Sequence, residues 1–227
     1  MEILLIRHAY PDYENDTLTE NGHEEAKLLA ERLRRVRLDK IYASPAGRAQ
    51  ATGRPTAAMK GISMTTLPWL QEVSLVPGID PWNHPAADVL QRPRVPALET
   101  WPEEVSYGKA YQPAHAAVAS AFDEVMAAHG YRREGRLYRV HRPSMERLAF
   151  FAHNGLIRML LSHLLNWAFP TLILSCHISP SGLTQLRFRE KNGTAVPELR
   201  SFNDVSHLDS RRKPADQDES LPLSFYS

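Results

Sequence analysis

Two short apolar runs in this chain end at a histidine, and a helical pattern follows each of them. The first run, Leu4-Leu5-Ile6, leads into Arg7 and His8, and the second, Leu148-Ala149-Phe150-Phe151-Ala152, leads into His153. Apolar runs of about four to eight residues that end in polar residues are typical of buried strands. If the two strands are parallel, both histidines reach the carboxyl edge of one sheet, where α/β proteins bind ligands. The pattern therefore predicts an α/β fold with a site at that edge.

The rest of the chain continues the alternation of strands and helices. Thr19 is a suitable N-cap for a first helix, and apolar residues then recur at helical spacing as far as Val36. A second strand is expected over Lys40–Ala43, followed by a helix of small residues from about Ala46. Further strands are expected at about 64–67, 183–189 and 196–202, the last two joined by an Asn192-Gly193 turn. This order predicts a three-layer α/β/α sandwich with a central, mostly parallel sheet.

Between about residues 73 and 144 the regular pattern breaks down. Many of the 17 prolines of the chain fall in this stretch. One helix is expected inside it, over about 113–129, with Gly130 at its end, and a strand over Leu137–Val140 is read as half of a hairpin that turns at Glu134-Gly135. We interpret the stretch as an irregular, partly helical insertion over the site of a single domain, residues 1–208. The charged and polar residues 209–227 are expected to form a mobile tail.

Composition narrows the possible partners and the compartment. The formal net charge is +1, so the chain has no overall field for nucleic acid or an anionic membrane, and an anionic partner must be small and locally recognised. No apolar run approaches the roughly 18 residues of a membrane span. Cys176 is the single cysteine, which excludes an internal disulfide and fits a reducing compartment. With no signal peptide before the first strand, a cytoplasmic location is expected.

The Arg7-His8 pair already suggests a type of chemistry. A guanidinium offers a rigid fork of donors that suits phosphate or carboxylate. A neutral imidazole next to it can act as a nucleophile or carry a proton. His153 would bring a second imidazole to the same sheet edge. The ten histidines of the chain show no tight spacing of the kind that holds a metal ion.

Several motifs, taken together and in this order, resemble the histidine phosphatase superfamily, which includes the phosphoglycerate-mutase-like enzymes. The motifs span most of residues 3–208 and are Leu5-Ile6-Arg7-His8, Leu18-Thr19-Glu20-Asn21-Gly22, Ser44-Pro45-Ala46-Gly47-Arg48-Ala49 with Thr52, His153-Asn154-Gly155-Leu156-Ile157-Arg158, and Asn203-Asp204-Val205-Ser206-His207-Leu208. Two positions depart from the family pattern, since Ala9 and Asn154 stand where glycine is frequent.

The resemblance implies a role for each matching residue. His8 would attack phosphorus and become a phosphohistidine, which water then hydrolyses. Arg7, Arg48 and His153 would bind the phosphoryl group, and the amide of Asn154 would contact the substrate. Ser44 and His207 would brace the site. No metal ion and no cofactor are required, because the arginines neutralise the phosphoryl charge.

The general acid is less well defined by the resemblance. Glu72, in Leu70-Gln71-Glu72-Val73, is the candidate that would protonate the leaving oxygen. Gly78-Ile79-Asp80 is a faint echo of a run that the phosphatases of the family often carry after this glutamate. Asp80 is therefore a second candidate, and a site without an acid is the third reading.

These inferences lead to one expected function and two alternatives. We expect a metal-independent phosphomonoesterase that acts on a small phosphorylated metabolite. A phosphoglycerate-mutase type of phosphotransfer is the first alternative, although such enzymes typically carry Arg-His-Tyr-Gly where this chain has Val73-Ser74-Leu75. The second is a non-catalytic protein that binds a phosphorylated ligand.

Overall fold

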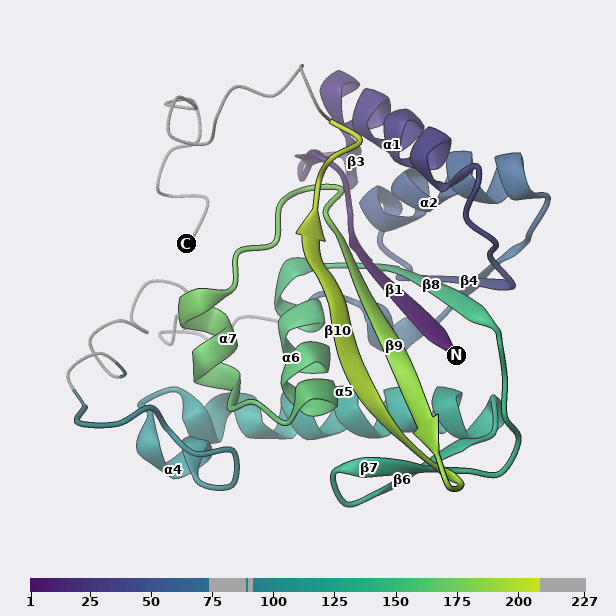
Figure 1. Ribbon diagram of the computed structural model, residues 1–227. Helices are drawn as coiled ribbons and strands as arrows, with labels where there is room; N and C mark the ends of the chain where they lie inside the picture. Colours follow the sequence, from purple (N-terminus) through teal and green to yellow (C-terminus); the bar gives the residue numbers. More distant parts are fainter. Residues whose placement is uncertain (74–88, 90–91, 209–227) are drawn as a thin grey trace.

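An eight-stranded mixed sheet forms the centre of the computed structural model, which describes residues 1–73, 89 and 92–208 (Figure 1). Its strands are β1 (Glu2–Arg7), β4 (Lys40–Ala43), β5 (Met64–Thr66), β6 (Tyr131–Glu134), β7 (Leu137–Val140), β8 (Arg147–Ala152), β9 (Leu183–Lys191) and β10 (Thr194–Asp204). Their order in the sheet is β5-β4-β8-β1-β9-β10-β7-β6. A separate two-stranded ribbon pairs β2 (Pro11–Asp12) with β3 (Thr17–Leu18).

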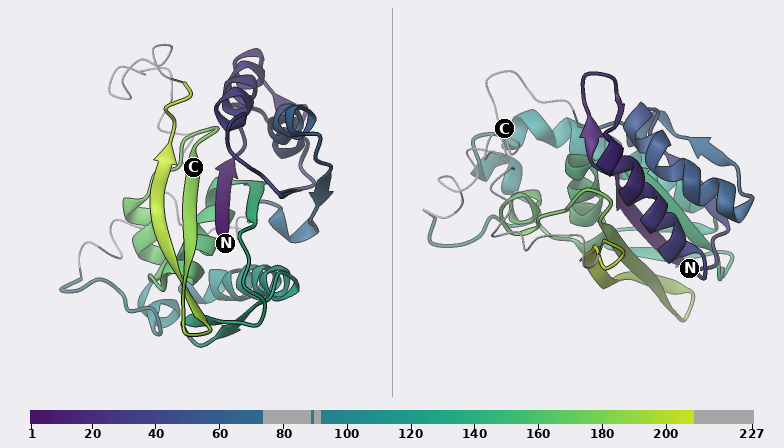
Figure 2. Two further views of the ribbon diagram at one scale, coloured as in Figure 1. Left: turned by 45° about the vertical axis from the view of Figure 1, so that its right-hand side comes forward. Right: turned by 90° about the horizontal axis from the view of Figure 1, so that it is seen from above.

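The expected α/β fold is confirmed, and parallel pairing is found in one half of the sheet. Strands β5, β4, β8 and β1 are parallel, whereas the pairs β1–β9, β9–β10, β10–β7 and β7–β6 are antiparallel. The antiparallel half follows from its connections, since turns such as Asn192-Gly193, where both residues have positive φ, join only antiparallel neighbours. Figure 2 shows β10, β9 and β1 side by side.

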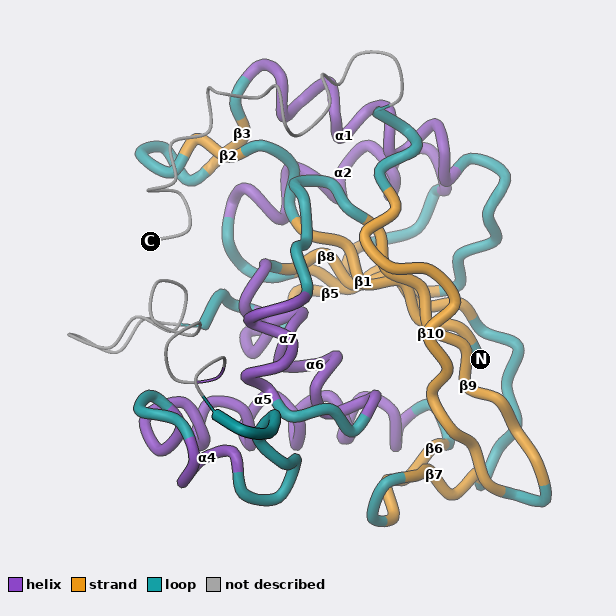
Figure 3. The backbone as a smooth tube through the Cα atoms, turned by 60° about the vertical axis from the view of Figure 1, so that its left-hand side comes forward, coloured by secondary structure: helices purple, strands orange, loops and turns teal. Residues whose placement is uncertain are grey.

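Helices cover both faces of the sheet, which completes the three layers (Figure 3). One face carries α1 (Glu20–Leu33) and α2 (Gly47–Lys60), and the other carries α5 (Gly108–Ala128), α6 (Asn154–Leu165) and α7 (Phe169–Ser175). A hydrophobic core lies on each face of the sheet, and strand β1 contributes side chains to both. Leu4 and Ile6 pack with residues of α1, while Ile3 and Leu5 pack with residues of α5, α6 and α7 on the other face. Within the described part of the chain, no helix has both the length and the apolar character that crossing a bilayer requires.

Part of the predicted insertion belongs to the main core. Helix α5 ends where expected, with Gly130 at φ 93°, but it begins at Gly108 and runs through Pro113, at the loss of one intrahelical hydrogen bond. Its residue Phe122 shares a core with Leu5. The predicted hairpin is present as β6 and β7, which extend the sheet beside β10.

Two short elements complete the described chain, and some predicted segments fall outside it. The 3-10 helix η1 (Pro68–Leu70) follows β5, and the short helix α4 (Trp101–Glu104) precedes α5. Residues 74–88 and 90–91, which are part of the insertion predicted over about residues 73–144, lie outside the described residues, as does the tail predicted over 209–227. The domain boundaries therefore stay a prediction.

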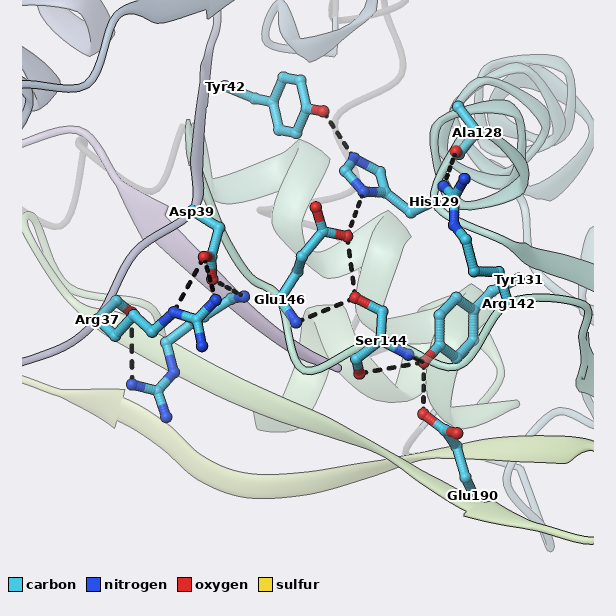
Figure 4. A network of polar contacts seen from close by, with 11 residues as sticks. Arg37, Asp39, Tyr42, Ala128, His129, Tyr131, Arg142, Ser144, Glu146 and Glu190 are labelled. Atoms are coloured by element: carbon cyan, nitrogen blue, oxygen red, sulfur yellow. Dashed lines mark hydrogen bonds and ion pairs between the residues drawn. The ribbon is translucent and has the colours of Figure 1, made fainter.

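A chain of polar contacts ties the end of α5 to the amino ends of the parallel strands (Figure 4). His129 lies 2.9 Å from the Tyr42 hydroxyl through Nε2 and 2.9 Å from the Glu146 carboxylate through Nδ1. The chain continues through Ser144 and the Tyr131 hydroxyl to Glu190 on β9. These contacts lie at the end of the sheet opposite His8 and His153. They therefore hold the end of α5 against the sheet and do not involve these two histidines.

Candidate active site

The predicted site residues follow the carboxyl ends of three adjacent parallel strands. His8 follows β1, His153 follows β8, and Ser44 follows β4, with β8 between the other two. The register brings these ends to one level, because Arg7 pairs with Ala152 and Ala43 pairs with Phe151. The ring centroids of His8 and His153 are 5.2 Å apart. Two segments distant in sequence therefore bring both imidazoles to the same sheet edge.

His8 is buried and has one ring nitrogen engaged. Its Nδ1 lies 2.8 Å from the carbonyl oxygen of Ala9. A carbonyl oxygen only accepts, so Nδ1 must carry the proton and Nε2 keeps its lone pair. Burial lowers the pKa of His8 well below its ordinary value, and the neighbouring Arg7 cation lowers it further. The ring is therefore neutral at pH 7, and its unprotonated Nε2 has the lone pair that a nucleophile requires.

The two arginines are each anchored through one end of the guanidinium. Arg7 Nη1 donates to the carbonyl oxygen of Ile178 at 2.6 Å, and Arg48 Nη1 donates to Asp16 Oδ1 at 2.6 Å. The Nε atoms of both arginines are buried and have no hydrogen-bond partner among the described residues. Both cations also lower the pKa of His153, so they lie close to the pair of imidazoles.

His153 is fully buried between the strand β8 and the helix α6. Its Nε2 lies 2.8 Å from the Ser44 hydroxyl oxygen, while its Nδ1 is buried and finds no partner in the described part of the chain. Burial, with the charges of Arg48 and Arg7, lowers the pKa of His153 to about 3. Three buried nitrogens near His8 thus lack partners among the described residues: His153 Nδ1, Arg7 Nε and Arg48 Nε.

Glu72 lies at the first turn of α6. Its carboxylate accepts hydrogen bonds from the backbone N–H groups of Gly155 at 3.2 Å, Leu156 at 3.0 Å and Val73 at 2.9 Å. His153 is the N-cap residue of α6 but makes no side-chain capping bond, so Glu72 takes over that function from another loop. This placement puts the carboxylate beside His153. Asp80, the second candidate for the acid, lies outside the described residues.

Asn154 is the first residue of α6 and carries an unpartnered polar atom. Its Oδ1 is buried without a hydrogen-bond partner among the residues that the structure describes. The two ends of a side-chain amide exchange places by a half-turn, so the same position can offer an N–H donor to an anion. Asn154 thus follows His153 directly and adds a second unpartnered polar atom at the start of α6.

Sequence reasoning missed two residues of this site, Tyr13 and Asp16. Asp16 Oδ2 accepts the Gly47 N–H at 2.7 Å and so caps α2, whose own N-cap residue is an alanine. The ring of Tyr13 lies under the Arg48 guanidinium carbon at 5.5 Å, and its centroid is 6.4 Å from that of His8. The only available signal was their position between the Arg7-His8 pair and the first helix, because no local pattern marks either residue.

The arrangement defines a class of protein. A neutral imidazole with a free lone pair lies near two guanidiniums and a second imidazole, each with a buried nitrogen that has no partner among the described residues. Preorganised donors of this kind stabilise an oxyanion, and paired arginines suit a phosphoryl group in particular. The fold and the site are therefore those of an α/β enzyme of phosphoryl transfer.

Comparison with known proteins gives the family. The sequence matches the histidine phosphatase superfamily (branch 1) over residues 3–203. The chain belongs to this superfamily and is a histidine-type phosphatase. No curated protein matches it in a sequence search.

Several solved structures share the fold at low sequence identity. Phosphoserine phosphatase from Entamoeba histolytica, in complex with 3-phosphoglyceric acid, has 19% identity and a TM-score of 0.64, with 91% of this chain and 98% of that chain covered. Mycobacterial glucosyl-3-phosphoglycerate phosphatase has 20% identity and a TM-score of 0.62, with coverage of 89% and 98%. The alpha-ribazole phosphatase from Shigella flexneri has 16% identity and a TM-score of 0.56, with coverage of 90% and 97%.

Proposed function

We propose that this chain is a metal-independent phosphomonoesterase that hydrolyses a small phosphorylated metabolite through a phosphohistidine at His8. One observation carries the proposal. The Nδ1 proton of His8 is held by the Ala9 carbonyl, which leaves the Nε2 lone pair free near the unpartnered Nε atoms of Arg7 and Arg48 and the unpartnered Nδ1 of His153. A nucleophile and the donors for its electrophile are thus present together before substrate arrives.

The first step transfers the phosphoryl group to the protein. His8 Nε2 attacks phosphorus, an N–P bond forms, and the bond from phosphorus to the leaving oxygen breaks. Arg7 and Arg48 neutralise the charge on the phosphoryl oxygens, so no metal ion is assigned to that task. Glu72 supplies a proton to the leaving oxygen, because a simple alkoxide leaves poorly without one.

The second step returns the protein to its starting state. Glu72, now a carboxylate, takes a proton from a water molecule as the water oxygen attacks phosphorus. The N–P bond breaks, inorganic phosphate is released, and His8 Nε2 regains its lone pair. In the empty site Glu72 closes the first turn of α6, so the same side chain would combine a structural and a catalytic role.

The fold comparison supports a small organic phosphate as substrate. The similar solved structures are named as phosphatases of phosphoserine, glucosyl-3-phosphoglycerate and alpha-ribazole. The net charge of +1 offers no broad field for a polyanion, so recognition would be local to the pocket.

Trapping of the phosphoenzyme tests the proposal. The protein is mixed with a chromogenic aryl phosphate, quenched in base, and analysed by mass spectrometry for a phosphate adduct that is stable in base and lost in acid. We expect the adduct on His8 and no turnover by His8→Ala. His115→Ala is the matched control, because His115 is also largely buried but bonds to Ser162 outside the site. Turnover by His8→Ala near the wild-type rate would refute the mechanism.

A further inference from the structure

The hydroxyl of Ser44 has a single acceptor for its proton. Ser44 is fully buried, its Oγ accepts the Ala46 N–H at 3.2 Å, and the same oxygen lies 2.8 Å from His153 Nε2. No other side-chain or backbone acceptor receives the Ser44 O–H among residues 1–73, 89 and 92–208. A buried hydroxyl proton without an acceptor is costly and rare.

This constraint decides which nitrogen of His153 carries a proton. Since burial and the two arginines lower the pKa of His153 to about 3, the ring is neutral at pH 7 and has one N–H. If that proton were on Nε2, it would donate to Ser44 Oγ and leave the Ser44 O–H unsatisfied. If Ser44 donates to Nε2, the hydroxyl proton and Nε2 are both satisfied and the His153 proton lies on Nδ1. The Nδ1–H is then the only group of the pair without a partner among the described residues, whereas the other arrangement leaves both the Ser44 O–H and Nδ1 without one.

The surroundings of Nδ1 agree with this assignment. An N-cap side chain normally accepts the N–H groups of the first helical turn, which would call for a lone pair on Nδ1. In α6 those N–H groups, from Gly155 and Leu156, donate to Glu72 instead. Nδ1 itself is buried and makes no hydrogen bond, as donor or as acceptor, with the described residues, like the Nε atoms of Arg7 and Arg48.

We propose that Ser44 is a positioning residue that fixes His153 in the tautomer with its proton on Nδ1 and thereby turns an N–H toward the phosphoryl site. The phosphoryl part of this inference rests on the proposed function, whereas the tautomer does not. A lone pair on Nδ1 would face the phosphoryl oxygens and repel them, whereas an N–H donates to them without His153 becoming charged.

The chain contains a second serine–histidine pair, between the partly buried His115 and the buried Ser162, in which the same reasoning gives the opposite result. His115 Nε2 lies 2.9 Å from Ser162 Oγ, and the Ser162 hydroxyl donates to the carbonyl oxygen of Trp167 at 2.7 Å. Because that proton is already used, Ser162 must accept from His115, whose proton therefore lies on Nε2. Burial, with His163 nearby, lowers the pKa of His115 to about 4, so this ring is also neutral at pH 7.

Nitrogen NMR of the full chain labelled with ¹⁵N-histidine reads both tautomers directly, because protonated and unprotonated ring nitrogens have well-separated shifts. At pH 7 without ligand, we expect His153 to be protonated on Nδ1 and His115 on Nε2, with assignments from the His153→Gln and His115→Gln variants. A wild-type His153 protonated on Nε2 would overturn the inference. Since no substrate is present, this result is independent of whether the chain hydrolyses a phosphate ester.

The Ser44→Ala variant tests the cause. With the hydroxyl removed, we expect the Nδ1–H preference of His153 to be lost and the dissociation constant for inorganic phosphate to rise about tenfold. Ser162→Ala is the matched control and should leave the His153 shifts and the phosphate affinity unchanged. A His153 that stays protonated on Nδ1 in Ser44→Ala would show that Ser44 does not set the tautomer. If the wild-type chain shows the expected tautomer but neither binds nor turns over phosphates, the proposed function fails and the tautomer assignment stands.

Discussion

The carboxylate of Asp16 holds both the side chain of Arg48 and the end of the helix that carries it. Asp16 Oδ1 accepts from Arg48 Nη1 at 2.6 Å, and Oδ2 accepts the Gly47 N–H at 2.7 Å. Although burial acts to raise the pKa of Asp16, these hydrogen bonds and the Arg48 charge outweigh it and lower that pKa. Asp16 is thus an anion above acidic pH, and it holds the Arg48 guanidinium through Nη1.

Asp16→Asn is expected to weaken substrate binding more than it slows the chemical step. The amide keeps an oxygen for the Gly47 N–H but loses the ion pair that orients Arg48. We expect KM for an aryl phosphate to rise about three- to tenfold with a smaller change in kcat. Asp12→Asn is the control, because Asp12 lies in the same loop and its side chain bonds only to Asn15 and neighbouring backbone. Equal effects of the two variants would remove Asp16 from the positioning of Arg48.

Glu72→Gln separates the catalytic from the structural role of this side chain. If Glu72 is the general acid, hydrolysis of alkyl phosphates should fall by about 10²- to 10³-fold, while aryl phosphates, whose oxygen leaves without much protonation, should lose far less. Loss of the helix cap alone would lower the free energy of unfolding by about 1 kcal/mol and affect both substrates alike. Parallel kinetics on the two substrate types, with urea unfolding, distinguish the two results. Equal losses would reassign the acid.

Protonation of His153 is expected to destabilise the fold in acid. Its pKa is about 3 in the folded protein against an ordinary value of 6.5, so between these values the unfolded chain binds more protons. Stability is therefore lost as the pH falls from about 6.5 toward about 3. Between pH 7 and pH 5 the loss from this group is about 2 kcal/mol in the free energy of unfolding. We expect the free energy of unfolding, measured with urea, to fall by about 2 kcal/mol less between pH 7 and pH 5 in His153→Gln than in the wild type. The same pH dependence in both proteins would contradict the buried neutral state of His153.

Chelators are expected to leave turnover unchanged. The proposed chemistry assigns charge neutralisation to Arg7 and Arg48, so incubation with EDTA followed by gel filtration should not alter the rate with an aryl phosphate. Arg48→Lys should lower the rate even with divalent metal added, because a lysine cannot reproduce the fork of a guanidinium. A loss of activity on chelation that Mg²⁺ or Zn²⁺ restores would overturn the metal-independent mechanism.

The part of the site that could be predicted is the part that local sequence patterns encode. An apolar run ending in a histidine specifies a buried strand and a polar side chain at its end, and two such runs sufficed to place His8 and His153 together. Arg7 was visible beside His8 at the end of the same run, whereas the resemblance to the family supplied Arg48. The end of α5 was also predictable, because Gly130 alone accepts the left-handed backbone at that point.

The rest depends on contacts between distant segments, which no local pattern records. Asp16 caps α2 and Glu72 caps α6 from other loops, whereas a search for caps in sequence looks only one to three residues ahead of the helix. The start of α5 was misplaced for a related reason, since Pro113 was read as a helix start while packing of the earlier turn carries the helix back to Gly108. The mixed character of the sheet likewise arises from the pairing of β1 with β9.

Helices α2 and α6 are both capped by a carboxylate from another loop, Asp16 and Glu72 respectively. This has a consequence for which substitutions can alter the candidate site. A substitution in the short loop before α1 affects Arg48 through the carboxylate of Asp16, and one directly after η1 affects the start of α6, next to His153, through the carboxylate of Glu72. Tuning of activity by mutation should therefore concentrate at two small loops that local sequence inspection would pass over as mere connectors.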